Sequence, residues 1–337
     1  MKNNPITIKD IARILGISPS TVSRALKDHP DISTETKKAV NELAVRLKYQ
    51  PNAIALSLKQ SRSNTIGVII PEIVHHFFSS VISGIEDVAY NAGFTVMICQ
   101  SNERYDREVA NAKMLLSHRV DGVLVSIAKE STNFDHLKLL KEGGMPLVFF
   151  DRIVPGMQAD HVVIDDEEAA YKATKHLIEN GRKRIAHFSG PEHLMIGRNR
   201  KNGYLRALSE AGLAVDPSLI IQADNYEKAV VAVRRLADLN NLPDGIFTTN
   251  DLTAVGAMQA LQKLGIEIPK QIAIIGFSDG RLSGITNPTL SSVDQHGYEM
   301  GSIATEILLN RILSPDEKYT PVTRVLEGQL VVRESSI

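Results

Sequence analysis

The sequence of 337 residues has a single cysteine, Cys99, and no tryptophan. One thiol can form no disulfide within the chain and no cysteine-based zinc site. Aromatic residues make up only 5% of the chain, which argues against a stacking platform for single-stranded nucleic acid. No apolar run approaches the roughly 18 residues of a membrane helix, and the N-terminus lacks the apolar core of a secretory signal. We therefore expect a soluble, cytoplasmic protein that does not contact a membrane.

The sequence also has almost no net charge, since its formal net charge is -1. That average argues against a nucleic-acid partner. It conceals a division, however, because residues 1–62 contain 11 Lys+Arg and 5 Asp+Glu, a net charge of +6. Subtraction from the totals of 38 and 39 leaves 27 basic and 34 acidic residues in 63–337, a net charge of -7. The chain is thus a small basic head on a larger acidic body, with length enough for two or three domains.

Motifs of common enzymes are missing as well. The sequence contains no GxxxxGK[ST] loop and no HExxH. The adjacent pair His75-His76 has the wrong spacing for two ligands of one metal on a helix. The acidic run 165–168 stands where a helix begins, so complementing the helix dipole explains it better than a metal site. We expect neither catalysis, nor a bound metal, nor a cofactor.

Three short helices are predicted within residues 1–50. Thr7 with Asp10 can form a capping box at the first, and Ser18 followed by Pro19 is a typical start for the second. The third begins near Ser33. This is the layout of a helix-turn-helix domain, in which the second helix enters the major groove of DNA.

The polar residues of the second helix should lie mostly outside the small core. Ser20, Thr21, Ser23 and Arg24 suit phosphates and base edges in a major groove. A generic three-helix subdomain with a solvated polar face is the alternative. Residues 51–64 then read as a short amphipathic hinge helix and a polar linker. So short a helix is marginal alone and should fold against a partner copy, DNA or both.

Residues 65–337 change to an α/β rhythm. Short apolar runs rich in β-branched residues alternate with helical stretches, as in buried parallel sheets. A first set comprises TIGVII, FTVMIC, DGVLVSI and PLVFFD, and a second comprises HVVID, RIAHFSG, DGIFTTN and IAIIGF. Two such sets predict two doubly wound α/β lobes, with a ligand in the cleft between them. A sugar-binding transport protein shares this fold, but it requires a signal peptide and no basic head.

These segments together resemble the LacI/GalR family of bacterial transcription regulators. The resemblance covers TIKDIARILGISPSTVSRALKDHPDISTETKKAVNELAVRLKYQPNAIALSLK over its whole length. It continues through IGVIIPEIVHHFFSSVISGIEDVAYNAGFTVMICQS, VDGVLV, GRNRKNGY, FTTNDLTAVGAMQAL and IAIIGFSD. It implies a homodimer that binds a near-palindromic double-stranded operator, with a body like the type I periplasmic binding proteins. A small effector would control DNA affinity from the cleft.

The resemblance assigns roles in DNA binding to individual positions. Pro19 and Ser20 would occupy the main base-selecting positions, Thr7 would meet a phosphate at a helix N-terminus, and Leu58 would wedge into the minor groove. Leu58 could also simply pack one hinge helix on the other. The full implied set is Thr7, Ser18, Pro19, Ser20, Thr21, Ser23, Arg24, Asn52, Ala55 and Leu58.

The resemblance also assigns an effector site. Asn250 would aim at the ligand while Asp251 caps the next helix, and Arg200 would bind the effector. One departure stands out, since Ser278 occupies the position of a usual aspartate and Asp279 follows it. Either Asp279 substitutes from a shifted loop, or the pocket accepts a different or phosphorylated effector. The residue types favour a sugar, with a purine or phosphorylated metabolite as the alternative. The implied set is Phe77, Phe78, Asp151, Arg200, Asn250, Ser278, Asp279 and Gln295.

Overall fold

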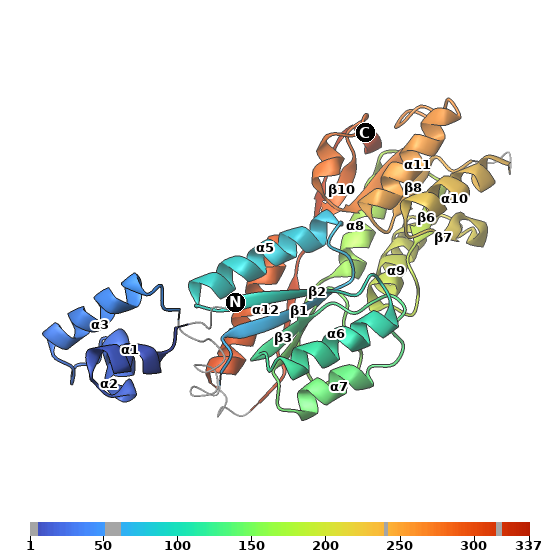
Figure 1. The fold of residues 1–337 in the computed structure, drawn as a ribbon. Helices are drawn as coiled ribbons and strands as arrows, with labels where there is room; N and C mark the ends of the chain where they lie inside the picture. The colour runs from blue at the N-terminus through green and yellow to red at the C-terminus, as the bar shows by residue number, and fades with distance from the viewer. Residues whose placement is uncertain (1–5, 51–61, 239–241, 315–318) are drawn as a thin grey trace. The chain divides into compact units, whose positions relative to one another are not determined.

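The chain divides into two compact units, Met1–Ser63 and Asn64–Ile337, which are described separately. The structure, a computed structural model, describes residues 6–50, 62–238, 242–314 and 319–337 (Figure 1). Asn52, Ala55 and Leu58, with the predicted hinge helix, lie outside the described residues.

The first unit contains the three expected helices. They are α1 (Ile8–Leu15), α2 (Pro19–Leu26) and α3 (Thr34–Arg46). Gly16 ends α1 in the left-handed conformation, with a φ of 64°, which glycine adopts without strain. One buried side chain from each helix, Ile11, Val22 and Val40, anchors the small core. The apolar spacing of the sequence therefore produces the predicted helix-turn-helix fold.

The second unit is built from two mainly parallel sheets. In the first sheet the strand order is β11-β5-β4-β3-β1-β2, and in the second it is β12-β10-β9-β8-β6-β7. The strands of the first sheet are β1 (Thr65–Ile70), β2 (Thr95–Gln100), β3 (Gly122–Val125), β4 (Leu147–Phe150), β5 (Asp160–Ile164) and β11 (Thr323–Leu326). The strands of the second sheet are β6 (Ile185–Ser189), β7 (Ile220–Gln222), β8 (Gly245–Thr248), β9 (Ala273–Ser278), β10 (Ser291–Asp294) and β12 (Gln329–Val331).

Helices cover both faces of each sheet (Figure 1). The first lobe carries α5 (His76–Asn91), α6 (Tyr105–Ser117), α7 (Asp135–Glu142) and α12 (Gly297–Leu313). The second lobe carries α8 (Asp166–Glu179), α9 (Met195–Glu210), α10 (Tyr226–Asp238) and α11 (Asp251–Lys263). Short 3₁₀ turns span Pro217–Leu219, Arg281–Gly284 and Glu334–Ser336.

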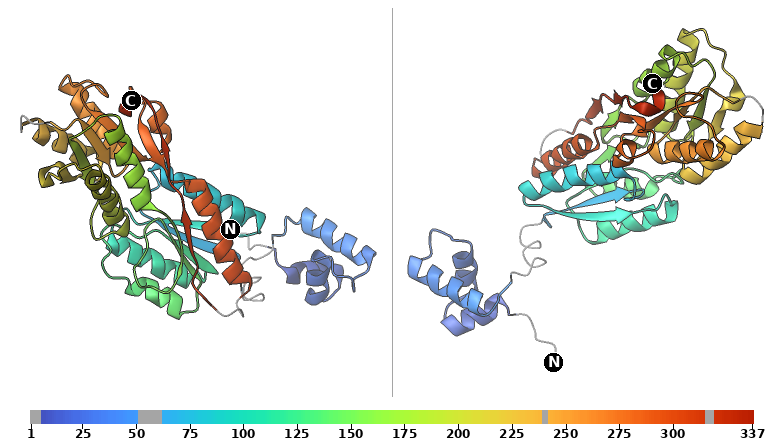
Figure 2. Two further views of the ribbon diagram at one scale, coloured as in Figure 1. Left: turned by 180° about the vertical axis from the view of Figure 1, so that it is seen from behind. Right: turned by 90° about the horizontal axis from the view of Figure 1, so that it is seen from above.

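Within the described part of the body, the chain crosses between the lobes three times. The crossings join β5 to α8, β10 to α12, and β11 to β12, and Figure 2 shows the last stretch of chain running from one lobe to the other. Among the strands that the structure describes, only β12 runs antiparallel to its neighbour. One sequence prediction is wrong here, because HVVID was grouped with the second lobe. It forms β5, which pairs with β4 and β11 in the first sheet, and the chain crosses only after it.

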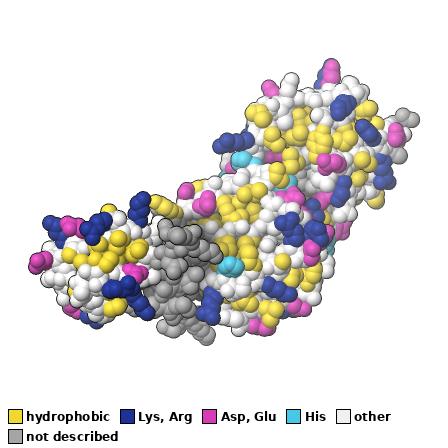
Figure 3. Space-filling view, viewed as in Figure 1, with side chains coloured by type: hydrophobic (Ala, Val, Ile, Leu, Met, Phe, Trp, Pro, Cys, Tyr) yellow, Lys and Arg dark blue, Asp and Glu magenta, His cyan; other side chains and the backbone are white. Residues whose placement is uncertain are grey.

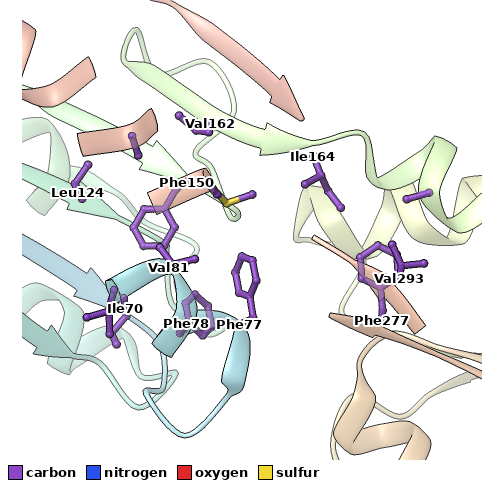
Figure 4. Packing of buried hydrophobic residues seen from close by; sticks show 14 of the residues in the cluster. Ile70, Phe77, Phe78, Val81, Leu124, Phe150, Val162, Ile164, Phe277 and Val293 are labelled. Carbon is purple, nitrogen blue, oxygen red and sulfur yellow. The ribbon is translucent and has the colours of Figure 1, made fainter. Parts of the chain in front are cut away.

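Apolar packing holds each lobe and links the two. One buried cluster contains residues of both sheets, including Phe150 of β4 and Phe277 of β9 (Figure 4). Phe77 and Phe78 at the start of α5 belong to the same cluster, their ring centroids 5.2 Å apart. The carboxyl ends of both sheets thus meet a continuous apolar base, which positions the cleft.

Candidate DNA-binding face and effector cleft

The start of α2 presents a group of short polar side chains. Ser18 is the N-cap, and its hydroxyl accepts a hydrogen bond from the Thr21 amide at 3.1 Å. The same Oγ lies 2.7 Å from Ser20 Oγ and 2.8 Å from Thr21 Oγ1. Pro19 and Ser20 are exposed. The N-terminus of α2 is therefore capped by its own side chains and open to a partner.

Farther along α2, buried and exposed residues separate cleanly. Val22 and Ala25 enter the core, Thr21 and Ser23 are half-buried, and Arg24 is exposed. Arg24 Nη1 lies 3.9 Å from Asp31 Oδ2, in an ion pair with both side chains mostly in solvent. Such a pair contributes little, so the guanidinium can leave it for a DNA phosphate or base.

Thr7 is the N-cap of α1, as predicted. Its amide donates to Asp10 Oδ2 at 3.0 Å and its hydroxyl donates to the same oxygen at 2.7 Å. These hydrogen bonds hold the pKa of Asp10 below its usual value. The hydroxyl proton is committed to Asp10, so its lone pairs and the free amides of the first turn are what a partner would meet.

Seven of the eight predicted effector residues line one cavity between the lobes. They are Phe77, Phe78, Asp151, Arg200, Asn250, Ser278 and Gln295. The cavity lies where strands of both sheets end, the usual ligand position in such folds. Seven of the residues that the family resemblance implied therefore lie around one cavity, although their part in binding stays a prediction.

Asp279 is the exception. It does not line the cavity, because both its carboxylate oxygens accept hydrogen bonds from Arg333, at 2.5 and 3.1 Å. Arg333 also donates to the carbonyl of Leu290, which fixes the pair against the second sheet. The structure therefore does not support Asp279 as a substitute carboxylate in the cleft.

Asp151 contributes a carboxylate to the cavity lining. It is buried, its Oδ2 accepts a hydrogen bond from Ser126 Oγ at 3.4 Å, and Arg152 Nε is 3.7 Å away. Burial raises the pKa of Asp151 above its usual value, although Arg152 and Arg200 oppose that shift. Few protein donors reach it, so its oxygens can accept hydrogen bonds from a ligand.

Arg200 projects from α9 and is held on three sides. Its Nε donates to Asp166 Oδ1 at 2.7 Å, its Nη1 donates to the Thr249 carbonyl at 2.7 Å, and its Cζ lies 3.8 Å from the centroid of the Phe277 ring. Arg200 and Asp166 are 4% and 2% exposed. Burial raises the pKa of Asp166 to about 6, with the charge of Arg200 opposing that rise.

Two residues of the acidic run 165–168 have different roles. Asp165 caps α8, since its Oδ1 accepts from the Glu168 amide at 2.9 Å, in keeping with the predicted helix start. Asp166 instead turns inward to orient Arg200, a role that the sequence alone did not reveal. The described residues contain no group of three or more His, Cys, Asp or Glu side chains able to hold a metal ion.

Ser278 and Gln295 form a polar pair at the cleft wall. Ser278 Oγ donates to Gln295 Oε1 at 2.9 Å. Gln295, which lies on the crossing from β10 to α12, is buried, and its Nε2 has no hydrogen-bond partner among the described residues. An unpaired buried donor is costly, so this amide is suited to an acceptor oxygen on a ligand.

Asn250, and not Asp251 as the sequence suggested, caps the helix that follows. Asn250 caps α11, accepting from the Thr253 amide at 2.9 Å, and its Nδ2 donates to the Asp224 carbonyl at 3.0 Å. Asp251 does not cap the helix, because its carboxylate accepts from the Gly280 amide and from two serine hydroxyls. Asn250 still lines the cavity and retains one donor hydrogen for a ligand.

The sequence analysis missed the charged residues at the cleft mouth. Glu103, Lys129, Arg152 and Asp224 also line the cavity. Arg152 donates to both oxygens of Glu103, at 3.0 and 2.8 Å. Their position just after strands was the available signal, since Glu103 follows β2 and Asp224 follows β7. Which charges pair across the cleft depends on loop conformations that no local pattern encodes.

The two units together define a DNA-binding protein whose body is a two-lobed ligand-binding fold. Residues 7–52 match the family model of bacterial regulatory proteins of the lacI family. Residues 63–331 match the model of periplasmic binding proteins and the sugar binding domain of the LacI family. The chain belongs to the LacI family of bacterial regulatory proteins.

Individual relatives agree with this assignment. The chain is 36% identical over 314 residues to an HTH-type transcriptional repressor PurR of Vibrio atlanticus, which covers 93% of both chains. It is 35% identical over 305 residues to catabolite control protein A of Priestia megaterium, covering 90% of this chain and 91% of that one. A solved complex of the transcriptional regulator CelR with cellobiose is similar, with a TM-score of 0.75, 29% identity, and 98% and 99% of the chains covered. The family and these relatives are regulators rather than enzymes.

Proposed function

We propose that this chain is a transcriptional repressor that binds a near-palindromic operator as a homodimer and is controlled by a small neutral sugar in the interlobe cleft. Residues 1–50 would read DNA, 51–64 would form the hinge, and 65–337 would bind the effector and dimerise. Because its target is bacterial chromosomal DNA, we assign it to the cytoplasm. The described residues contain no helix long and apolar enough to cross a membrane.

The pairing of cleft charges carries the assignment of a neutral effector. Lys129, Arg152 and Arg200 are the lysine and arginine residues among the described residues that line the cavity. Each is already paired with a carboxylate, at 2.6 to 2.8 Å. A phosphorylated ligand needs uncommitted cations, and here it would have to displace buried carboxylates. A neutral ligand avoids that cost.

The remaining groups match the chemistry of sugar hydroxyls. Asp151 offers acceptor oxygens, whereas the free Gln295 amide offers a donor. Phe77 and Phe78 supply an apolar wall against which a sugar ring can pack. A sugar hydroxyl donates and accepts at once, so it can satisfy both kinds of group. The relative with cellobiose in its structure is a precedent within the same fold.

The exposed polar face of α2 supports the DNA-binding half of the proposal. Ser20 and Arg24 are exposed on a helix that is packed at its back by Val22. Two such heads in a homodimer would enter successive major grooves, which explains the expected near-palindromic operator. Selection from a randomised duplex DNA pool should enrich a near-palindromic motif. Recovery of no motif would contradict sequence-specific binding.

A thermal-shift screen tests the effector class. Three panels would be compared: neutral pentoses, hexoses and disaccharides; their phosphates; and purine bases and nucleosides. Only a neutral sugar should raise the melting temperature, since a ligand at 100 times its Kd stabilises a protein by about 2.7 kcal/mol. A larger shift with a sugar phosphate or a purine would overturn the sugar assignment and leave the regulator assignment intact.

A further inference from the structure

Lys129 of the first lobe contacts the second lobe twice. Its Nζ donates to Asp224 Oδ2 at 2.6 Å. Its backbone carbonyl accepts a hydrogen bond from Nε2 of His193 at 2.7 Å. Asp224 and His193 lie in different loops of the second lobe, after β7 and β6 respectively. A single residue therefore connects one lobe to two separate loops of the other.

The loop that carries Lys129 is held firmly within the first lobe. Glu108 is fully buried in α6, and its two oxygens accept from the Ala128 amide at 2.5 Å and from Ser131 Oγ at 2.8 Å. His136 Nε2 lies 2.8 Å from the same carboxylate. The Lys129 amide itself donates to Glu103 Oε2 at 2.8 Å. The interlobe contacts of Lys129 are therefore made from a loop that is fixed within the first lobe.

These groups belong to a chain of alternating charges that spans the cleft mouth. Asp224 is bound on one side by Lys129 and on the other by Lys228, each at 2.6 Å. Burial would raise the pKa of Asp224, but hydrogen bonds from both lysines hold it below its usual value. Beyond Lys129 the chain continues at 3.9 Å to Glu103 and from there to Arg152. Arg152 in turn lies beside Asp151 on the cavity wall.

We propose that Lys129 is a positioning residue that latches the two lobes together and sets their resting angle independently of any effector. The interlobe bonds are made by the chain's own groups, so closure requires no ligand to bridge the lobes. A ligand that engages Asp151 or Arg152 perturbs the same charge chain, which gives the cleft a direct route to the latch. Lys228 binds the same aspartate from within the second lobe and therefore cannot latch.

The experiment measures the distance between the lobes by pulsed electron resonance on the full chain. Spin labels are placed at Lys113→Cys on α6 and Asn202→Cys on α9, both exposed, in a Cys99→Ala background. Labelled subunits are diluted in unlabelled protein so that only distances within one subunit are read. Lys129→Met should lengthen the mean distance or add a longer population, whereas the matched control Lys228→Met should leave the distribution unchanged.

Two further measurements keep the result decisive. Asp224→Asn, which retains the shape of its partner, should reproduce the opening caused by Lys129→Met, and the two together should add nothing further. Raising KCl from 0.05 to 1 M should open the unsubstituted protein more than the Lys129→Met variant. Identical distributions in all the variants would overturn the latch, as would equal opening by Lys228→Met. No effector or operator is needed, so failure here leaves the proposed function untouched.

Discussion

Three cleft residues that are not glycine adopt a left-handed backbone. Glu103 has a φ of 59°, Asp151 of 58° and Ser278 of 122°. Conformations of this kind cost on the order of 1–3 kcal/mol each and persist only where the surrounding structure imposes them. Asp151 directly follows β4, Ser278 ends β9, and Glu103 lies in the loop after β2, and all three line the cavity. Three of the ten described non-glycine residues with a positive φ thus line the cavity that we assign to the effector.

Replacing Asp151 should increase the stability of the protein and decrease its affinity for the sugar. Replacement by Asn removes a buried charge whose pKa is raised by burial, and Asn tolerates a positive φ well. Asp151→Asn should therefore raise the free energy of unfolding at neutral pH, and it should weaken sugar binding because a charged hydrogen-bond acceptor is lost. Urea unfolding and calorimetric titration with a sugar found in the screen measure the two effects. Stabilisation without loss of affinity would remove Asp151 from the site.

Asp166 should make stability depend on pH. Its pKa in the folded protein is about 6, above the ordinary value of 3.8, because of burial. The folded state then binds the proton more tightly, so this contribution to stability is complete below pH 3.8 and is lost as pH rises through 6. Between pH 4 and 7 the unfolding free energy should fall by roughly 2–3 kcal/mol relative to Asp166→Asn. A constant difference between the two proteins across this range would contradict the raised pKa.

Replacing Arg24 should weaken DNA binding and leave the effector-binding body unaffected. Arg24→Ala should weaken binding to a selected duplex about tenfold or more, because a guanidinium contact to a base or phosphate is lost. Arg46→Ala, an exposed arginine at the end of α3, serves as the matched control. Gel-shift titration gives both affinities. Equal affinities for the two variants would place the DNA contact elsewhere.

At the scale of elements, both lobes rely on glycines where helices touch. A Cβ on Gly301 of α12 would lie 2.1 Å from the Val81 carbonyl oxygen of α5. In the second lobe, a Cβ on Gly203 of α9 would lie 2.1 Å from the Glu167 carbonyl oxygen of α8. Backbone atoms cannot yield as a flexible side chain can, so these helix pairs approach as closely as they do only because glycine is present.

Gly203→Ala should therefore destabilise the second lobe. Overpacking of a helix interface costs about 1–3 kcal/mol, and α9 also carries Arg200, so sugar affinity should fall as well. Gly284→Ala is the control, since nothing lies within 4 Å of its added Cβ and its φ is not positive. Denaturant unfolding measures both variants. If Gly203→Ala leaves the unfolding free energy unchanged, α8 and α9 can move apart to accommodate the added methyl group without cost, which would contradict the prediction.

Elements also show what the sequence could predict and what it could not. Ser18 and Pro19 announce α2 because capping is local chemistry, and Gly16 ends α1 for the same reason. The lobe of β5 was misjudged because strand pairing is decided by contacts distant in sequence. Most of the predicted effector residues line the cavity, because the family resemblance assigned them by their positions in the matched segments. The Arg333 partner that removes Asp279 from the cavity comes from 54 residues away and leaves no local signal.

At the scale of the whole molecule, charge is divided between the two units. The head carries +6 and the body -7 over residues 1–62 and 63–337. On the face drawn in Figure 3, basic and acidic side chains of the body are interspersed, without a single large basic patch. Only the head then has the charge to attract DNA, with an affinity that falls steeply with salt.

A fragment that begins at residue 63 should accordingly keep sugar binding and lose DNA binding. Its net charge of -7 opposes DNA, so we expect no duplex binding in a gel shift even at low salt. The body forms a compact unit with its own core, so sugar binding by calorimetry should match that of the full chain. Duplex binding by this fragment would mean that the body, not the head, contacts DNA.

The three crossings between the lobes make the body a mechanical linkage. Asp165, the pair 295–296 and the pair 327–328 act like three short straps across one joint. Three short connections at one place oppose sliding of one lobe past the other, and they leave rotation of the lobes as the easier motion. The angle between the two lobes then describes the conformation of the body. The three connections also provide redundancy, because a single proteolytic cut between β11 and β12 would leave two straps intact. A protein cut there should still rotate its lobes, bind the effector and change its affinity for DNA in response.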